Sequence, residues 1–222
     1  MVYSVITLTG AGTMNHLVMI ADVIGSRQLA NRGQVQTLLE AELHTLHKDR
    51  TGLASPYTIT LGDEFQAVFK GADRVFPDIL AILRALHPVG LRFALGIGPI
   101  TTRINPEQAI GMDGPAFYQA RDLLERMKKD RRILAVAGLP EDDGLQESAL
   151  GLLDHQLRKW RPNRLDILRL LLQGWEAGTI ADHLDITEQS VYKNIREGGL
   201  EHAIQLTQAL TGRMNNALAR TD

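Results

Sequence analysis

Two aspartates at the ends of predicted strands have the chemistry to bind a divalent cation together. Asp22 follows the apolar run HLVMIA, and Asp63 lies in the turn of the hairpin TITLGDEFQAVF. Magnesium and similar hard cations take oxygen ligands, usually one or two carboxylates supplemented by waters and substrate phosphates. A two-residue turn with glycine in its first central position explains Gly62-Asp63 equally well without any ligand. The metal-site hypothesis therefore depends on whether the fold places Asp22 beside Asp63.

The turn after the first aspartate, Gly25-Ser26-Arg27, has the composition of a phosphate-binding loop. Small residues let backbone amides approach a phosphate, and the arginine adds a bidentate contact. Glu64 adjoins the second aspartate, but strand alternation places it on the opposite face of the sheet, so we expect it outside the site. These features predict one pocket that holds Mg²⁺ or Mn²⁺ together with a phosphorylated ligand.

The elements that must position these side chains alternate between strand and helix. Between the strands, apolar residues at helical spacing predict three amphipathic helices. The apolar face of the first is predicted to carry Val35, Leu38, Leu39, Leu43 and Leu46. The hairpin contributes antiparallel strands and the helical crossovers contribute parallel ones, so the order predicts an α/β sandwich with a mixed sheet. The strands are predicted over residues 16–23, 57–61, 65–69, 91–98 and 132–137.

Composition divides the chain into four segments. Residues 1–13 share no pattern with the rest and precede a second methionine, so we expect a disordered extension or a start-site artefact. Residues 14–137 form the predicted α/β domain. Residues 138–154 are acidic at first and rich in glycine, which predicts a linker. Residues 155–222 are predicted to form a small all-α domain.

The composition of the 222-residue chain excludes several classes of protein. The chain has no cysteine, which excludes a disulfide framework, a zinc finger and a thiol nucleophile. It has neither a run apolar enough to span a bilayer nor an export signal, so we expect a cytoplasmic protein without a membrane partner. The formal net charge is −2, so contact with DNA requires a local basic patch.

The C-terminal segment has the apolar spacing of a helix-turn-helix motif. Asp185 stands in the turn, where aspartate tolerates left-handed backbone geometry, and Thr187 can cap the second helix. The apolar positions that fit the motif are Ala181, Leu184, Ile186, Val191 and Ile195.

This motif predicts a surface that contacts DNA. The second helix would present Thr187, Glu188, Gln189, Ser190, Tyr192, Lys193 and Arg196 to bases and phosphates. The DNA backbone would also contact a basic cluster, Arg158, Lys159, Arg161 and Arg164. The alternative is a small helical bundle used for dimerisation or docking, which the acidic residues Asp182, Asp185 and Glu188 favour because they oppose DNA.

Four segments of the sequence resemble the core of the class III nucleotide cyclases: ADVIGSR, GDEFQAVF, LRFALGIG and GPAFYQARDL. Together with MDGPAFYQAR, they are more similar to the SatD-like family of bacterial proteins, which join a cyclase-like domain to a C-terminal helix-turn-helix. The resemblance covers nearly the whole chain from Met14 onward. It implies a ferredoxin-like or palm-type α/β sandwich with a mixed sheet, plus a small all-α helix-turn-helix domain.

The cyclase resemblance also implies roles for individual residues. It implies a two-metal site on Asp22 and Asp63, with the backbone carbonyl of Val23 as a further ligand and Arg121 stabilising the transferring phosphate. Two positions depart from the pattern: Ile59 stands where purine-selective cyclases carry lysine, and Phe117 where they carry asparagine. Losing one preorganised donor typically costs on the order of 100- to 1000-fold in rate, so we expect weak or absent cyclase activity.

Together these features predict a DNA-binding transcriptional regulator whose cyclase-like domain senses a nucleotide, another phosphorylated ligand or a metal. One alternative is a magnesium-dependent nucleotidyl cyclase or transferase that acts on a nucleoside triphosphate. Another is a scaffold without catalytic activity. Cyclase-like sites and helix-turn-helix proteins usually work as two-fold pairs, so we expect a homodimer.

Overall fold

A five-stranded sheet forms the centre of the computed structural model, which describes residues 14–142 and 144–220. The sheet order is β2-β3-β1-β4-β5, in which β1 is antiparallel to β3 and β4, and β5 is parallel to β4. The first four strands therefore have the ferredoxin-like arrangement, and the predicted mixed α/β sheet is confirmed. The strands are β1 Asn15–Val23, β2 Leu53–Leu61, β3 Glu64–Phe69, β4 Leu91–Pro99 and β5 Leu134–Ala137.

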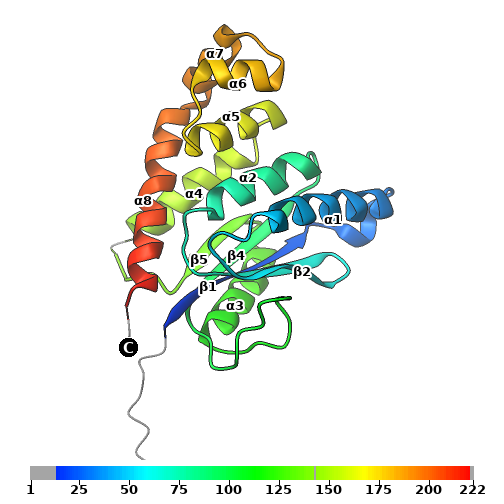
Figure 1. The fold of residues 1–222 in the computed structure, drawn as a ribbon, viewed down its shortest axis with the longest axis vertical. Helices are drawn as coiled ribbons and strands as arrows, with labels where there is room; N and C mark the ends of the chain where they lie inside the picture. The colour runs from blue at the N-terminus through cyan, green and yellow to red at the C-terminus, as the bar shows by residue number, and fades with distance from the viewer. Residues whose placement is uncertain (1–13, 143, 221–222) are drawn as a thin grey trace, which may run out of the picture.

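Helices cover both faces of the sheet (Figure 1). α1 (Arg32–Lys48) and α2 (Val75–Leu86) lie on one face, and α3 (Pro115–Asp130) lies on the other. The alternation of β1 explains both layers. Leu17 and Met19 belong to the apolar cluster under α1 and α2, whereas Val18 and Ile20 belong to a smaller cluster with Leu124 of α3.

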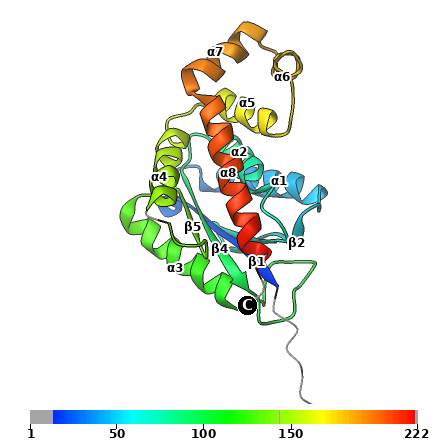
Figure 2. The same cartoon turned by 90° about the vertical axis from the view of Figure 1, so that its left-hand side faces the viewer.

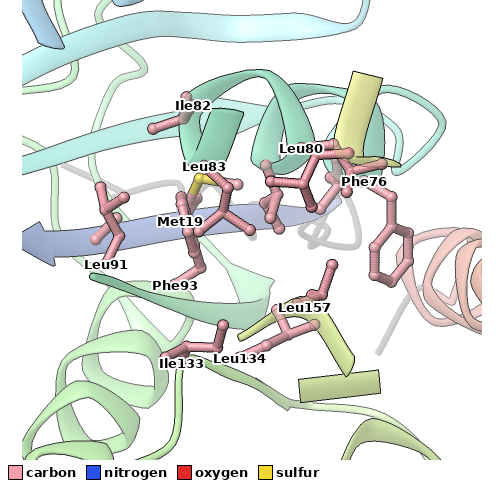
Figure 3. Close-up of a cluster of buried hydrophobic side chains, with 14 of the residues drawn as sticks. Met19, Phe76, Leu80, Ile82, Leu83, Leu91, Phe93, Ile133, Leu134 and Leu157 are labelled. Carbon is pink, nitrogen blue, oxygen red and sulfur yellow. The ribbon is translucent and has the colours of Figure 1, made fainter. Parts of the chain in front are cut away.

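The larger apolar cluster continues from the sheet into the C-terminal helices. Figure 3 shows Met19 and Phe93 of the strands near Leu83 of α2, and Leu157 beside Leu134. The helices that follow the sheet are α4 Leu145–Leu157, α5 Pro162–Leu172, α6 Ala177–Leu184, α7 Glu188–Gly198 and α8 Leu200–Leu218. α5 packs on α2. The predicted helical segment thus shares one core with the α/β unit.

The segment predicted as a linker, residues 138–154, is helical from Leu145 onward, so that prediction is wrong for its second half. α4 buries Leu150 and Leu153 in the larger core. The carboxylate of Asp154 is buried and accepts hydrogen bonds from the backbone amides of Ile133 and Leu134, at 2.5 and 3.1 Å. Apolar spacing begins only at Leu145, and the acidic composition before it obscured the helix.

The last helix connects the two ends of the described chain. Figures 1 and 2 show α8 running from α7 back to the sheet, with α6 and α7 at the end of the molecule opposite α3. The side chain of Asn215 accepts from the amide of Ala72 at 2.7 Å and donates to Asp73 at 3.2 Å. Asn15, at the start of β1, donates to the carbonyl of Ala217 at 3.1 Å. These bonds attach α8 to the α/β unit.

Two further predictions concern the ends of the chain and the membrane. The predicted extension over residues 1–13 lies outside the described residues. Among the helices that the structure describes, none has the length and apolar character to cross a membrane.

Candidate functional site

A cleft of about 740 Å³ opens where β1 ends beside the β2–β3 hairpin. Its walls include the predicted metal ligands Asp22, Val23 and Asp63 and the predicted phosphate loop of Gly25, Ser26 and Arg27. The amide of Val23 donates to the backbone carbonyl of Asp63 at 3.1 Å, which holds the hairpin turn against the end of β1. The fold therefore places the two aspartates side by side, as the metal-site hypothesis requires.

Two glycines with left-handed backbone geometry shape this end of the sheet. Gly62 has a φ of 62° and reverses the chain between β2 and β3. Gly25 has a φ of 66° and lies in the turn after β1. Ser26–Gln28 then form a 3₁₀ turn, closed by a 2.8 Å bond from the amide of Gln28 to the carbonyl of Gly25. Residues with a β-carbon adopt this geometry at a cost, so glycine suits both positions.

Asp22 is only 8% exposed, and its counter-ion is an arginine from the neighbouring strand. One terminal guanidinium nitrogen of Arg92 on β4 lies 3.2 and 3.3 Å from the two carboxylate oxygens. Burial raises the pKa of Asp22 above its ordinary value, and the charge of Arg92 opposes that rise. Lys128 opposes it further, whereas the charge of Asp63 adds to it. Asp22 is thus a desolvated carboxylate whose pKa depends on the charges of both Arg92 and Asp63.

Glu64 belongs to the cleft, so the expectation that it points away is wrong. Asp63 lies in the turn, and strand alternation begins only at Glu64, which is directly paired with Asp22 in the register of β1 and β3. Arg92 is paired with Asp22 on the other side, so the three side chains form a charged row across three strands. This row lies on the α3 face, because neighbouring Ile20 packs there.

Arg121, the predicted catalytic residue, lies beside the cleft and does not form part of its wall. Its guanidinium donates to Glu64 at 2.6 Å, and its side chain is 44% exposed. The contact to a phosphate implied by the cyclase resemblance stays a prediction.

Asp63 is held by the serine of the predicted phosphate loop. The hydroxyl of Ser26 donates to Oδ2 of Asp63, so this side chain supports the hairpin carboxylate. Within residues 14–142 and 144–220, no hydrogen bond involves Oδ1 of Asp63. Asp63 therefore keeps one oxygen for a ligand, while Asp22 is engaged by Arg92.

The donor set fits a divalent cation. Asp22, Asp63 and the carbonyl of Val23 offer the oxygen ligands that Mg²⁺ and Mn²⁺ prefer, with room for waters and phosphate oxygens. In the described part of the chain, no group of three or more histidine, cysteine or acidic side chains gathers as a ready-made metal cage. A cation at Asp22 would compete with Arg92 for that carboxylate.

Three cationic side chains in the cleft escaped the sequence analysis: Arg32 of α1, Arg92 of β4 and Lys128 of α3. Arg32 and Lys128 belong to none of the motifs that predict the site, and the segment LRFALGIG, which contains Arg92, gave that arginine no role. Arg92 does leave one signal, because it interrupts the otherwise apolar strand LRFALGIG. A charged residue in a strand covered on both faces is expected to have a partner.

The turn between α6 and α7 has the geometry predicted from its residues. Asp185 adopts a left-handed conformation with a φ of 53°, and the side chain of Thr187 accepts from the amide of Ser190 at 3.2 Å as a helix cap. Val191 is fully buried. The exposed residues of α7 include five that were predicted to contact DNA: Glu188, Gln189, Tyr192, Lys193 and Arg196.

Three of the four predicted basic residues lie together next to α7. Lys159, Arg161 and Arg164 line a groove of about 520 Å³ with Asn194 of α7. Arg164 donates to the side-chain oxygen of Asn194 at 3.2 Å. Arg158 does not line this groove, because its guanidinium pairs with buried Asp154 at 2.7 Å.

Comparison with known proteins gives a family and several structural similarities. The model of the SatD family matches residues 16–210. A bacterial light-regulated adenylyl cyclase is similar with a TM-score of 0.42 and 18% identity over 55% of this chain and 75% of that chain. The non-canonical dimeric guanylyl cyclase domain of a RhoGC fusion protein from the aquatic fungus Blastocladiella emersonii gives 0.36 and 14%, over 49% and 72%.

The guanylyl cyclase Cya2 gives a TM-score of 0.35 and 15% identity, over 52% of this chain and 70% of that one. No curated protein matches the chain.

Proposed function

The chain belongs to the SatD family, and we propose that it is a DNA-binding regulator whose cleft binds a nucleotide or similar phosphorylated ligand with a divalent cation. The observation that carries this proposal is the convergence on one cleft of Asp22, Asp63 and the Gly25-Ser26-Arg27 turn. Several cationic side chains line the same cleft. They balance the carboxylates and suit a polyanionic ligand.

The residues of the cleft divide into two proposed groups. Asp22, Asp63 and the carbonyl of Val23 would hold Mg²⁺ or Mn²⁺. Such a cation neutralises and orients phosphate oxygens when bound. Arg27 and Arg32, which line the same cleft, would contact the phosphates. The backbone at Gly25 would be accessible to the ligand, because no protein atom lies within 4 Å of the position that a β-carbon would take there.

Sensing is proposed in preference to turnover. Ile59, which replaces the lysine of purine-selective cyclases, packs against the larger apolar cluster, and Phe117 is buried in the smaller one. Neither side chain lines the cleft. The cleft therefore has the groups to hold phosphates but lacks the two donors that the cyclase resemblance calls for.

The end of the molecule formed by α6 and α7 is the proposed DNA-binding surface. The groove that joins Lys159, Arg161 and Arg164 to α7 supports this role, since phosphate contacts there would fix the position of the helix. Gln189, Lys193 and Arg196 are exposed on α7, where they would reach base edges or phosphates. A homodimer would present two such helices to two half-sites.

Thermal unfolding with ATP or GTP and MnCl₂, followed by analysis of the nucleotides, tests the ligand half of the proposal. We expect nucleotide with metal to raise the melting temperature without forming product, and Asp63→Asn to abolish the rise. Asp130→Asn, an exposed aspartate at the end of α3, is the matched control. A rise that persists in Asp63→Asn contradicts the proposal. Cyclic product that depends on Asp63 establishes the cyclase alternative instead.

Selection from a random duplex library, followed by a retention assay on the enriched duplex, tests the DNA half. The double variant Lys193→Ala with Arg196→Ala should weaken retention by about 10-fold or more, because the two contacts are lost together. The control is Arg126→Ala with Lys129→Ala on α3, at the opposite end of the molecule. Equal retention by wild type and the α7 variant, or no enrichment, contradicts this half.

A further inference from the structure

Arg92 lies where a cation bound to Asp22 would act. Its side chain is only 13% exposed, and it comes from β4 in direct register with Asp22 on β1. One guanidinium nitrogen contacts both oxygens of that carboxylate, at 3.2 and 3.3 Å. The protein thus supplies its own positive charge at the proposed metal ligand.

Most N–H groups of the Arg92 guanidinium form no hydrogen bond with the described residues. Arginine has five N–H groups in a planar fork, and its strongest pairs with carboxylates engage two nitrogens in parallel. Here a single nitrogen serves both oxygens of Asp22, and the buried Nε has no partner among the described residues. A buried polar group without a partner calls for an explanation, such as a ligand that completes its bonding.

We propose that Arg92 is an internal counter-ion, which competes with the divalent cation for Asp22 and transfers to a ligand phosphate when the cation binds. A buried carboxylate without a partner strongly destabilises the folded protein. Arg92 therefore balances the charge of Asp22 while no ligand is bound. Once a cation occupies Asp22, two positive groups meet at one carboxylate, and the phosphate is the anion to which Arg92 can turn. This inference rests on the proposed function of the cleft.

This competition couples the binding of the cation to the binding of the phosphate. A cation alone has to displace Arg92 without offering it another partner, so it binds weakly. A phosphate offers that partner, so cation and phosphate each strengthen the binding of the other. Arg121 does not have this role, because it pairs with Glu64 and its side chain is 44% exposed. Water can therefore satisfy Arg121 when its ion pair opens.

Calorimetric titration with MnCl₂ alone tests the competition. Arg92→Gln should bind Mn²⁺ about 10-fold more tightly than wild type, a typical factor for coupled sites. Adding Asp22→Asn to Arg92→Gln should remove this gain. Arg126→Gln, an exposed arginine of α3, should behave as wild type. Equal or weaker Mn²⁺ binding by Arg92→Gln overturns the proposal.

Inorganic triphosphate tests the transfer. Saturating Mn²⁺ should tighten triphosphate binding in wild type, and this effect should be smaller in Arg92→Gln, which keeps the contact of the cation with the phosphates but lacks the transferred arginine. If wild type binds neither ion nor triphosphate, the proposed function of the cleft fails. If wild type binds both through Asp63 and Arg92→Gln changes neither, only the role of Arg92 fails.

Folding of the variant is checked by circular dichroism. If Arg92→Gln is unfolded without Mn²⁺, Arg92→Lys takes its place, since a single ammonium pairs less well with a carboxylate. The rise in melting temperature caused by Mn²⁺ should then be larger in Arg92→Lys than in wild type. An equal or smaller rise overturns the proposal.

Discussion

The cleft and the end of the molecule formed by α6 and α7 present their charged residues in opposite ways. In the cleft, acidic side chains pair with arginines from other elements: Asp22 with Arg92 of β4, and Glu64 with Arg121 of α3, which lies beside the cleft. On α7, Lys193 and Arg196 come from one helix and are exposed to solvent. The buried charges of the cleft therefore depend on each other. On α7, Lys193 has only a solvent-exposed contact of 4.0 Å with Glu197 one turn away, so we expect its charges to act largely independently.

The largest expected effect is the loss of one partner in the cleft. Arg92→Gln should lower the free energy of unfolding by about 3 kcal/mol, the lower end of the range for breaking a buried ion pair. Adding Asp22→Asn should cost much less in this background than in wild type, because the carboxylate is then no longer left unpaired. Urea denaturation of the four proteins measures the coupling. Additive effects would show that the cleft charges do not depend on each other.

Acid should reduce the loss of stability caused by Arg92→Gln. Burial already raises the pKa of Asp22 above its ordinary value of 3.8, and loss of Arg92 removes a group that opposes the rise. Protonated Asp22 has no need of a counter-ion. The penalty of Arg92→Gln should therefore be fully present at neutral pH and decrease as pH falls through the raised pKa toward 3.8. A penalty that is constant between pH 7 and pH 4 would contradict this account.

An intermediate effect is expected at the turn before α7, where backbone geometry matters more than charge. Asp185 has a φ of 53°, so a β-branched residue there should cost about 1–2 kcal/mol. Asp185→Val is the test and Asp185→Gly the control, since glycine accepts this geometry. Thermal unfolding gives both values. Equal stability of the two variants would show that the turn relaxes.

The smallest effect on stability is expected on the exposed face of α7. Lys193→Ala and Arg196→Ala should each change the free energy of unfolding by less than about 0.5 kcal/mol, as surface substitutions usually do. Their effects should add, unlike those in the cleft. Coupling as large as that between Asp22 and Arg92 would remove the contrast between the two regions.

The same contrast explains what the sequence could predict. Strand and helix order follows from local periodicity, and the α6–α7 turn follows from neighbouring residues, so both were predicted. Asp22 and Asp63 were chosen as candidate ligands because each lies close to a turn glycine, Gly25 or Gly62, and their role as ligands stays a prediction. The helix from Leu145 to Leu157 was missed, since an acidic, glycine-rich stretch precedes it.

Ion pairs between residues far apart in the chain could not be predicted from the sequence. Arg92 contacts Asp22 across 70 positions of the chain, and Arg121 contacts Glu64 across 57. Strand order and register decide the first contact, and the packing of α3 on the sheet decides the second. Local patterns specify neither. Glu64 was assigned to the wrong face of the sheet, because the residue at which β3 begins was not known from the sequence.

The most direct test of the central claim is anomalous diffraction from a crystal soaked with MnCl₂ and a nucleotide triphosphate. We expect a manganese peak between Asp22 and Asp63, within coordination distance of Oδ1 of Asp63, with Arg92 turned from Asp22 to a phosphate oxygen. A nucleotide bound in the cleft with no manganese peak, and with Arg92 still paired to Asp22, would contradict it.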